Sequence, residues 1–436
     1  MEKREESNME SRGRFDLRVR PALAAHDAKA ATAPDAVREK TVSLRVITPV
    51  FGGGVHISSD ENLRHLKDPD RCTPIRGSTV RGQLRFWWRV MCGATVEPQE
   101  LYEKESKIWG AARRPSPVSL SVEQSSINIA PVRVFDPNAT GFPRPERGME
   151  NIAYAAFPLQ SKSSGRERTA PGTLHEFKGP ATLTLRYPNY LAKDVEAALT
   201  GWLTFGGLGG RTRRGFGAVS DGNPISPSAL LEQYGIPPER LECVPSPTTF
   251  SDPAEALKYG LGKLRRFRQG VGVGRNPGAD SRRPGRSRWP EPEAIRKLLR
   301  TADPMHRERL VNVDKFPRAA FGLPIIFHFQ SKSDPEATTL HPKDAERMAS
   351  PLILRPILVA PNTYRCFALV LGVEEIPPRV VLTEQGQARR TFAADTTLTQ
   401  AEASTRHSPL RGIPDALFAF LDFFAMNPQT TKEQLP

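Results

Sequence analysis

Hydrophobic positions along this chain of 436 residues switch between the two periods that distinguish strands from helices. Residues 42–51 read as a strand, which Pro49 and the glycines at 52–54 bring to an end. After a long loop, residues 75–93 change to helical period. The apolar face of this helix, which we expect to be core, consists of Val80, Leu84, Trp87, Trp88 and Met91.

The elements that follow alternate between helices and strands. A second short helix is predicted at 98–109, a strand at 118–122, one or two strands within 173–187 and a helix at 191–205, after which a loop rich in Gly and Arg leads into a further strand. The order strand, helix, strands, helix, strand is that of a ferredoxin-like split βαβ unit. We therefore assign residues 41–222 to one domain. Residues 1–40 lack either periodicity and are interpreted as a flexible tail.

The second half of the chain is also predicted to mix helices and strands. Residues 223–250 are rich in Pro and Ser and are interpreted as a linker. Beyond them, the periodicity predicts helices at 252–269, 291–301 and 415–426, and strands at 323–329, 352–359 and 365–371. These elements predict a second α+β domain over 251–436, with a basic Gly/Arg loop at 270–290.

The composition of the chain restricts the kinds of molecule that the protein is expected to bind. The formal charge of +14 favours nucleic acid or another anionic surface. The four cysteines include no Cys-x-x-Cys pair, so neither a zinc ribbon nor a disulfide framework is expected. No apolar run reaches membrane-spanning length, and the N-terminus lacks an apolar signal core. We therefore expect a cytoplasmic protein with reduced thiols and no membrane partner.

The helix at 75–93 combines its apolar face with a stripe of arginines. Arg81, Arg85 and Arg89 repeat every four residues and no acid interrupts them. Thr79 is the expected N-cap, and Arg76 lies just before the helix. Free backbone N–H groups and the helix dipole favour an anion at such an end. The arrangement indicates a polyphosphate partner, most plausibly RNA, against the alternative of a solvated helix face.

A glycine-rich loop at 206–217 can be read in two ways. Its arginines can bind an RNA backbone while its glycines expose N–H groups, or the glycines can simply permit tight packing. We expect packing for the first two glycines and RNA contact for the arginines. The loop lacks the Gly-Lys-Ser/Thr of a phosphate-binding P-loop, so ATP binding is disfavoured. The glycines are Gly206, Gly207, Gly209, Gly210, Gly215 and Gly217, and the arginines are Arg211, Arg213 and Arg214.

A second basic segment lies between the predicted helices of the second half. From residue 261 to residue 290 there are nine Lys or Arg and one Asp. Arginine grips phosphate through two parallel hydrogen bonds, and a neighbouring tryptophan suits single-stranded RNA. We expect this segment to be mobile alone and ordered on RNA; the alternative is a disordered basic linker. The predicted contacts are Arg275, Arg282, Arg283, Arg286, Arg288 and Trp289.

Several stretches, in this order along the chain, resemble one protein family. They are Arg76-Gly-Ser-Thr-Val-Arg-Gly-Gln-Leu-Arg-Phe-Trp-Trp-Arg, Leu101-Tyr-Glu-Lys-Glu-Ser-Lys-Ile-Trp-Gly, the loop from Phe205 to Gly217, Gly285-Arg-Ser-Arg-Trp-Pro-Glu-Pro, Phe321-Gly-Leu-Pro-Ile and Arg347-Met-Ala-Ser-Pro-Leu-Ile-Leu-Arg-Pro. Together they are similar to the RAMP superfamily, and within it to the first-numbered RAMP subunit of the Cmr complex, the type III-B CRISPR effector. The loop alone would indicate only the superfamily.

The resemblance implies an α+β fold of two ferredoxin-like, RRM-related domains with a glycine-rich loop and long insertions. It also implies a place at the head of a ribonucleoprotein, where the chain would hold the 3′ region of the guide (cr)RNA and the guide–target duplex beside other RAMP subunits. Other subunits would perform the chemistry, so we expect an antiviral defence protein that is not itself an enzyme, with no cofactor and no metal.

Two alternatives stay open. The loop at 52–77 contains His56, Asp60, Glu61, His65, Asp68 and Asp70, and related RAMP proteins place cleavage residues at this point. A RAMP-family endoribonuclease is therefore chemically conceivable. Against it, the loop contains no His-x-x-x-His pair at ligand spacing. The second alternative is a purely structural assembly subunit whose basic face meets acidic protein neighbours.

Overall fold

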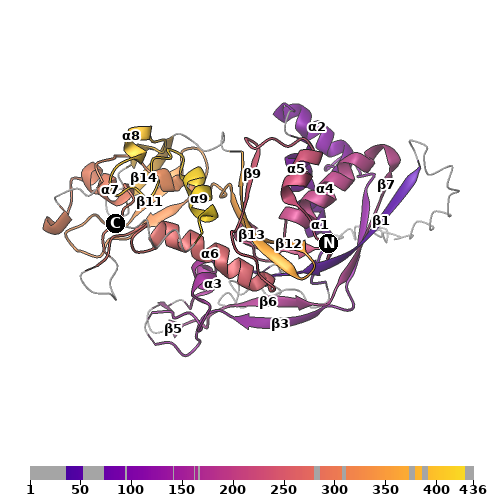
Figure 1. Cartoon of the computed structure of the whole chain (residues 1–436), viewed down its shortest axis with the longest axis horizontal. Helices are drawn as coiled ribbons and strands as arrows, with labels where there is room; N and C mark the ends of the chain where they lie inside the picture. Colours follow the sequence, from indigo (N-terminus) through magenta and orange to yellow (C-terminus); the bar gives the residue numbers. More distant parts are fainter. Residues whose placement is uncertain are drawn as a thin grey trace, which may run out of the picture.

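The computed structural model describes residues 36–52, 73–93, 96–140, 142–161, 163–164, 167–278, 285–306, 311–372, 379–384 and 391–427, and Figure 1 shows their arrangement. The chain is a mixed α+β protein with antiparallel sheets, as predicted. No helix within these ranges is both long enough and apolar enough to cross a membrane. Most of the predicted tail lies outside the described residues, but its last four residues belong to the first strand, which begins at Val37.

The first sheet has the strand order β2-β7-β1-β8, and each neighbouring pair is antiparallel. This is the order that a split βαβ unit gives, because two helical crossovers place the outer strands at opposite edges. Helices α1 and α4 cover one face, and their apolar stripes meet the alternate inward residues of β7. The elements are β1 (Val37–Val46), α1 (Gly77–Cys92), α2 (Pro98–Trp109), β2 (Ser119–Glu123), β7 (Ala181–Pro188), α4 (Ala192–Phe205) and β8 (Val219–Ser220).

A two-stranded ribbon is inserted between β2 and β7. It pairs β3 with β6 and was predicted only in part, because the alternation of residues 173–187 continues without a break into β7. Figure 1 places the ribbon along the lower side of the molecule, with helix α3 beside it. The elements are β3 (Asn128–Arg133), α3 (Glu150–Ala155), η3 (Phe157–Leu159), β4 (Ser163–Ser164), β5 (Glu167–Arg168) and β6 (Thr173–Lys178).

The stretch 223–250 is not a linker. It contains α5 (Pro227–Gln233) and β9 (Leu241–Pro245), and β9 pairs with β13 of the second half. Leu230, Leu231 and Leu241 are buried against the core of the first half. The Pro and Ser residues that suggested a linker flank these elements and cap them, since the Ser226 hydroxyl accepts a hydrogen bond from the first turn of α5.

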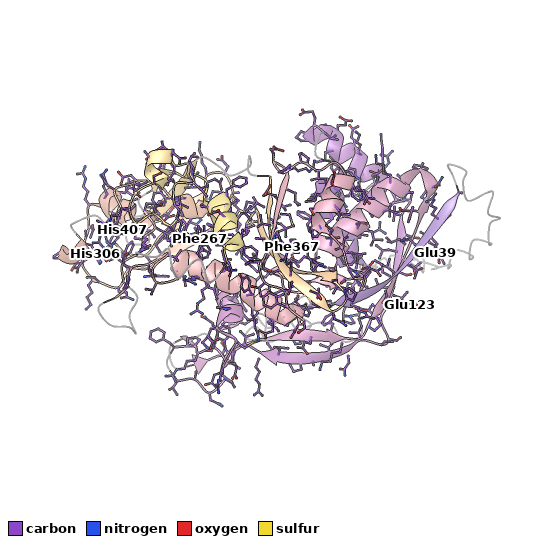
Figure 2. All side chains as sticks on the ribbon, in the orientation of Figure 1. Glu39, Glu123, Phe267, His306, Phe367 and His407 are labelled. Atoms are coloured by element: carbon purple, nitrogen blue, oxygen red, sulfur yellow. The ribbon has the colours of Figure 1, made fainter. Side chains whose placement is uncertain are left out.

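A central sheet with the order β12-β13-β9 joins the two halves. Strand β12 is apolar on both faces, as expected of a strand that is covered twice. One face of the sheet packs on the α1–α4 core, and Phe367 lies on that side; the other packs on α6 and α9, where Phe267 lies (Figure 2). The elements are α6 (Pro253–Gln269), β12 (Leu352–Ala360), β13 (Thr363–Leu371) and α9 (Ala416–Ala425). The predicted domain boundary therefore crosses a continuous core.

A third, four-stranded sheet with the order β10-β11-β14-β15 extends the second half and has a core of its own with α7. Only β10 and α7 were predicted, since the other three strands lie in stretches rich in polar residues. The elements are α7 (Glu291–Leu299), η6 (Pro304–His306), η7 (Pro317–Phe321), β10 (Ile325–Phe327), β11 (Thr338–Pro342), β14 (Arg379–Glu384), β15 (Thr391–Asp395) and α8 (Gln400–Ala403).

Candidate nucleic-acid interface

Helix α1 has the predicted inward face. Val80, Leu84, Trp87, Trp88 and Met91 are all buried. The predicted N-cap is wrong, because the helix begins at Gly77 and Arg76 occupies the N-cap position. The reason is that the backbone N–H of Thr79 already donates to the carbonyl of Arg76, which makes Thr79 part of the first turn. No side chain caps this helix end, and its first turn contains no acid.

The arginine stripe of α1 is partly neutralised by a buried acid. Glu105 of α2 accepts hydrogen bonds from Arg85 Nε and Arg89 Nε, each at 2.5 Å, and from Arg89 Nη2 at 2.7 Å. Its side chain is 3% exposed. Burial acts to raise the pKa of Glu105, but the hydrogen bonds from both arginines outweigh it, so that the pKa lies below its ordinary value. Arg85 and Arg89, two of the three arginines in the stripe, are therefore hydrogen-bonded within the protein.

Arg81, the third member of the stripe, also points toward the protein. Its Nη2 donates to the carbonyl of Val118 at 3.1 Å, just before β2. Burial and then the charge of Arg85 lower the pKa of Arg81. The Arg81 guanidinium therefore anchors the start of an edge strand, and any RNA contact would use its remaining N–H groups.

We predict that Glu105→Gln lowers the free energy of unfolding by roughly 1–3 kcal/mol, because it leaves two arginines without their counter-charge. The expected loss is below that of a fully buried pair, since both arginines reach solvent. Urea unfolding measures it, and Glu103→Gln, at an exposed position of the same helix, is the matched control. If Arg85 and Arg89 also contact phosphate, Glu105→Gln should tighten RNA binding. Unchanged stability would show that the ion pairs are not structural.

The glycines of the loop at 206–217 serve close packing. A side chain at Gly206 would meet Trp202 and Trp87, and one at Gly217, where φ is +62°, would lie 2.1 Å from the carbonyl oxygen of Leu208. The packing interpretation therefore holds for these positions, and also for Gly207. Gly209 and Gly215 have positive φ as well, and Gly210 lies against Phe51.

The arginines of this loop bind backbone carbonyls on both sides of it. Arg211 donates to Ala155 at 2.8 Å, beside the ribbon. Arg213 donates to the carbonyl of Ser350, and Arg214 donates to those of Leu352 at 3.1 Å and Phe321 at 3.3 Å. Burial lowers the pKa of Arg214 to about 10, so that it stays charged at neutral pH. The loop thus fastens the first half to the start of β12; phosphate binding by these arginines stays a prediction.

A buried arginine of the second half binds backbone carbonyls of the first half. Arg355 of β12 is 3% exposed, and its Nη2 donates to the carbonyl of Leu203 at 2.7 Å and to that of Val219. Leu203 lies in the last turn of α4, where unpaired carbonyls and the helix dipole favour a cation. Burial lowers the pKa of Arg355 to about 9. This side chain therefore fixes α4 and β8 against the central sheet.

The interpretation of Trp289 as an RNA-stacking residue is wrong for this structure. Trp289 is completely buried, and its ring meets Phe267 edge-on, with 5.5 Å between the centroids. Its indole N–H donates to the carbonyl of Arg268 at 3.0 Å. Trp289 has positively charged neighbours in the sequence, but in the structure it packs on the apolar face of α6. A large aromatic side chain gains most free energy from full burial.

The described part of the basic segment is held by hydrogen bonds within the protein. Arg288 Nε donates to Asn276 at 2.8 Å, and Arg286 pairs with buried Glu293 at 2.6 Å. Arg275 Nη1 reaches the carbonyl of Gly285 at 3.4 Å. Both described ends of this segment are therefore anchored to the protein, and the mobility of the segment stays a prediction. Arg282 and Arg283 lie outside the described residues.

The open face of the first sheet is not an aromatic platform. Its outward residues are mainly Ser and Thr, and the hydroxyls of Thr41 and Thr184 lie 3.3 Å apart. Glu39 and Arg186 form an ion pair of 2.6 Å on the same face. Glu39 and Glu123 mark the outer part of this sheet in Figure 2. A sheet face without exposed aromatic rings does not read bases as an RRM does.

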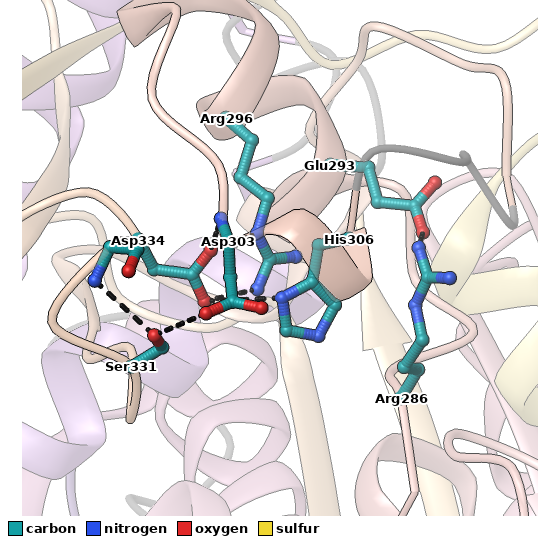
Figure 3. A network of polar contacts seen from close by, with 8 residues as sticks. Arg286, Glu293, Arg296, Asp303, His306, Ser331 and Asp334 are labelled. Atoms are coloured by element: carbon teal, nitrogen blue, oxygen red, sulfur yellow. Dashed lines mark hydrogen bonds and ion pairs between the residues drawn. The ribbon is translucent and has the colours of Figure 1, made fainter.

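A cluster of polar side chains lies near α7 (Figure 3). Arg296 binds both carboxylate oxygens of Asp334, at 2.8 and 2.7 Å, and His306 Nδ1 lies 3.4 Å from the same carboxylate. Burial raises the pKa of Asp334, but the hydrogen bond from Arg296 and further contacts outweigh it and bring the pKa to about 2. The Ser331 hydroxyl donates to Asp303 at 2.6 Å, so the cluster is an internal network of hydrogen bonds and ion pairs.

The predicted cleavage loop falls almost wholly on residues 53–72, which lie outside the described residues. Within the part of the chain that is described, no group of three or more His, Cys, Asp or Glu side chains is placed to hold a metal ion. The endoribonuclease alternative therefore stays a prediction.

Sequence reasoning missed two residues that hold the structure together: Glu105, which pairs with Arg85 and Arg89, and Arg355, which binds α4 and β8. A signal for each exists in the sequence. Glu105 lies between Leu101 and Ile108 on the buried face of a predicted helix, where an acid needs a partner. Arg355 interrupts an otherwise apolar strand. A charged residue on an apolar face is the pattern that identifies an internal ion pair or a cap.

Comparison with known proteins finds a family match in the first half of the chain. Residues 43–220 match the family model of the RAMP superfamily, which confirms the resemblance to that superfamily. Among solved structures, a chain of the type III-B Cmr-beta complex bound to cognate target RNA and AMPPnP in the presence of ssDNA is 10% identical, with a TM-score of 0.40, over 88% of this chain and 98% of that one. Cmr1 from Pyrococcus furiosus is 15% identical, with a TM-score of 0.39, over 77% and 87%. No curated protein matches the sequence significantly.

Proposed function

We propose that this protein is a non-catalytic, RNA-binding subunit of a type III-B CRISPR effector of the Cmr kind. It would hold the 3′ region of the guide RNA and the guide–target duplex beside other RAMP subunits in the cytoplasm, in defence against viruses. The observation that supports this most is the RAMP-superfamily match over residues 43–220, in a region that also contains the glycine-rich loop and the Trp-Trp helix.

The geometry favours recognition of the RNA backbone over recognition of base sequence. A guide has to be accepted whatever its sequence, and contacts to phosphate and sugar meet that need. The open sheet face offers hydroxyl and charged groups and lacks the aromatic rings that splayed bases would use. The net charge of +14 supplies the attraction.

The second half supports the inference of a second, modified ferredoxin-like unit. The order β9, α6, β12, β13, α9 parallels the order β1, α1, β2, β7, α4 of the first half, and the sheet order β12-β13-β9 matches three strands of the first sheet, β2-β7-β1. In the described residues the fourth strand has no counterpart in that sheet. The third sheet and α7 would then be insertions between these elements.

One observation favours the structural alternative. Most of the arginines that were expected to bind RNA donate hydrogen bonds to protein groups, so part of the basic character serves internal joining. A purely structural subunit would share the assembly role proposed here but would not bind RNA by itself. The two functions are therefore separable by a binding measurement on the isolated protein.

The test of the non-catalytic assignment uses end-labelled guide RNA and the purified full-length protein. We expect the RNA to be bound and to stay uncut, with or without Mg²⁺ or Mn²⁺. In the reconstituted complex, Asp60→Ala and His56→Ala should leave target cleavage unchanged. Loss of cleavage in either variant, with assembly and RNA binding intact, would establish the endoribonuclease alternative instead.

A further inference from the structure

A stack of aromatic and guanidinium groups runs from the surface into the core at the start of the glycine-rich loop. The Arg211 guanidinium carbon lies 4.6 Å from the centroid of the Phe157 ring and 5.5 Å from that of Phe51. Phe51 continues the stack to Phe216, with 6.0 Å between the ring centroids. Phe157, at the outer end, is 56% exposed, whereas Phe216 is completely buried.

The backbone holds this stack rigidly. Arg211 is in the left-handed conformation, with φ of 55°, and its Nη1 donates to the carbonyl of Ala155 at 2.8 Å. Gly210, the residue before it, donates its N–H to the carbonyl of Phe51 at 2.7 Å. Phe157 begins the short helix η3, directly after α3. The ring and the guanidinium therefore belong to segments that are already tied to each other before any ligand arrives.

The charge beneath the ring has no acidic counterpart among the described residues. Burial lowers the pKa of Arg211, and no carboxylate opposes that shift. Covering Arg211 with the half-exposed ring of Phe157 contributes little to the stability of the fold. A cation behind the ring does suit an electron-rich partner on the opposite face, because bases stack on aromatic side chains and their phosphates are attracted to positive charge.

We propose that the exposed face of Phe157 is a stacking site for one unpaired nucleobase of the bound RNA and that Arg211 positions the ring from behind. This inference rests on the proposed RNA-binding function and names a contact within it. The site would tolerate any base, because every base has an aromatic face. It would also supply the base contact that the open face of the first sheet cannot provide.

Phe142 provides a matched control on the same protein. It is 91% exposed and also follows β3 in the chain, but within the described residues no lysine or arginine packs on its ring. General exposure of an apolar ring is therefore common to both residues. The backing guanidinium distinguishes Phe157 from Phe142.

The test measures binding of the full-length protein to a single-stranded RNA that contains 2-aminopurine, whose fluorescence is quenched on stacking. We expect Phe157→Ala to weaken binding about tenfold and to abolish part of the quenching. Phe157→Trp should retain both, and Phe142→Ala should change affinity less than about twofold. The salt dependence of binding should be the same for Phe157→Ala and wild type, because no phosphate contact is removed.

Equal affinity of Phe157→Ala and wild type, or equal losses in Phe157→Ala and Phe142→Ala, would overturn the stacking site while leaving the proposed function intact. Absence of RNA binding by the wild type would overturn both. Circular dichroism of Phe157→Ala and Phe157→Leu separates a folding defect from a lost contact. If both variants are folded and only the aromatic residues restore quenching, the site is established.

Discussion

Replacing Trp87 with alanine is expected to lower the free energy of unfolding by about 3–5 kcal/mol, the cost of emptying a large aromatic site in a core. Trp87 is 2% exposed and stacks at 5.6 Å on Phe205 of α4. Gly201 of α4 already packs closely against Met91 and the Trp87 Cβ of α1, so the two helices cannot move closer together at that point to fill the space. The cavity would therefore remain largely open. Urea unfolding followed by circular dichroism measures the change.

Gly82→Ala, on the opposite side of the same helix, is the matched control. Gly82 is exposed, and a side chain at this position would meet no atom within 4 Å. Alanine there should raise the stability of the helix by up to about 1 kcal/mol. If RNA approaches α1 closely at this point, as the missing side chain would allow, Gly82→Ala should also weaken RNA binding. Stability of Trp87→Ala within 1 kcal/mol of wild type would contradict the packing described here.

Arg355→Met is expected to cost about 2–5 kcal/mol, although methionine fills a similar volume. The substitution leaves two buried carbonyl oxygens, those of Leu203 and Val219, without their donor, and each such loss costs roughly 1–3 kcal/mol. It also removes the cation at the end of α4. Because these contacts join the two halves, we expect the unfolding transition to become less cooperative and its midpoint to fall.

Arg355→Lys should restore part of the loss, because an ammonium can reach one of the two oxygens but lacks the planar fork of the guanidinium. Arg45→Met, at an exposed position of β1, should change stability by less than about 0.5 kcal/mol. An Arg355→Met protein as stable as wild type would mean that packing, not hydrogen bonding, holds the halves together at this point.

The sequence predicted well wherever one periodic face met one core. The inward face of α1 and the bounds of α2 both follow from such patterns, because burial alone selects the outcome. It predicted less well where the burial of a segment depends on a partner far away in the sequence. Strand β9 was assigned to a linker because its burial depends on β13, more than a hundred residues later.

The roles of the arginines were the hardest to predict. Arg85, Arg89 and Arg214 read as RNA contacts because their partners are a distant acid and distant backbone carbonyls, which leave no local pattern. Trp289 was misplaced for the same reason, since its neighbour Phe267 belongs to another helix. Charge alone indicates a polyanion, but it does not distinguish an arginine that binds RNA from one that joins two parts of the protein.

The central claim is that this protein holds RNA mainly through its sugar-phosphate backbone. It is tested most directly by the slope of log Kd against log salt for the purified full-length protein and two guide RNAs of unrelated sequence. The account predicts the same steep slope for both RNAs, with roughly 0.7 contributed by each phosphate contact on a single strand. A slope near zero, or tight binding to only one of the two sequences, would contradict it.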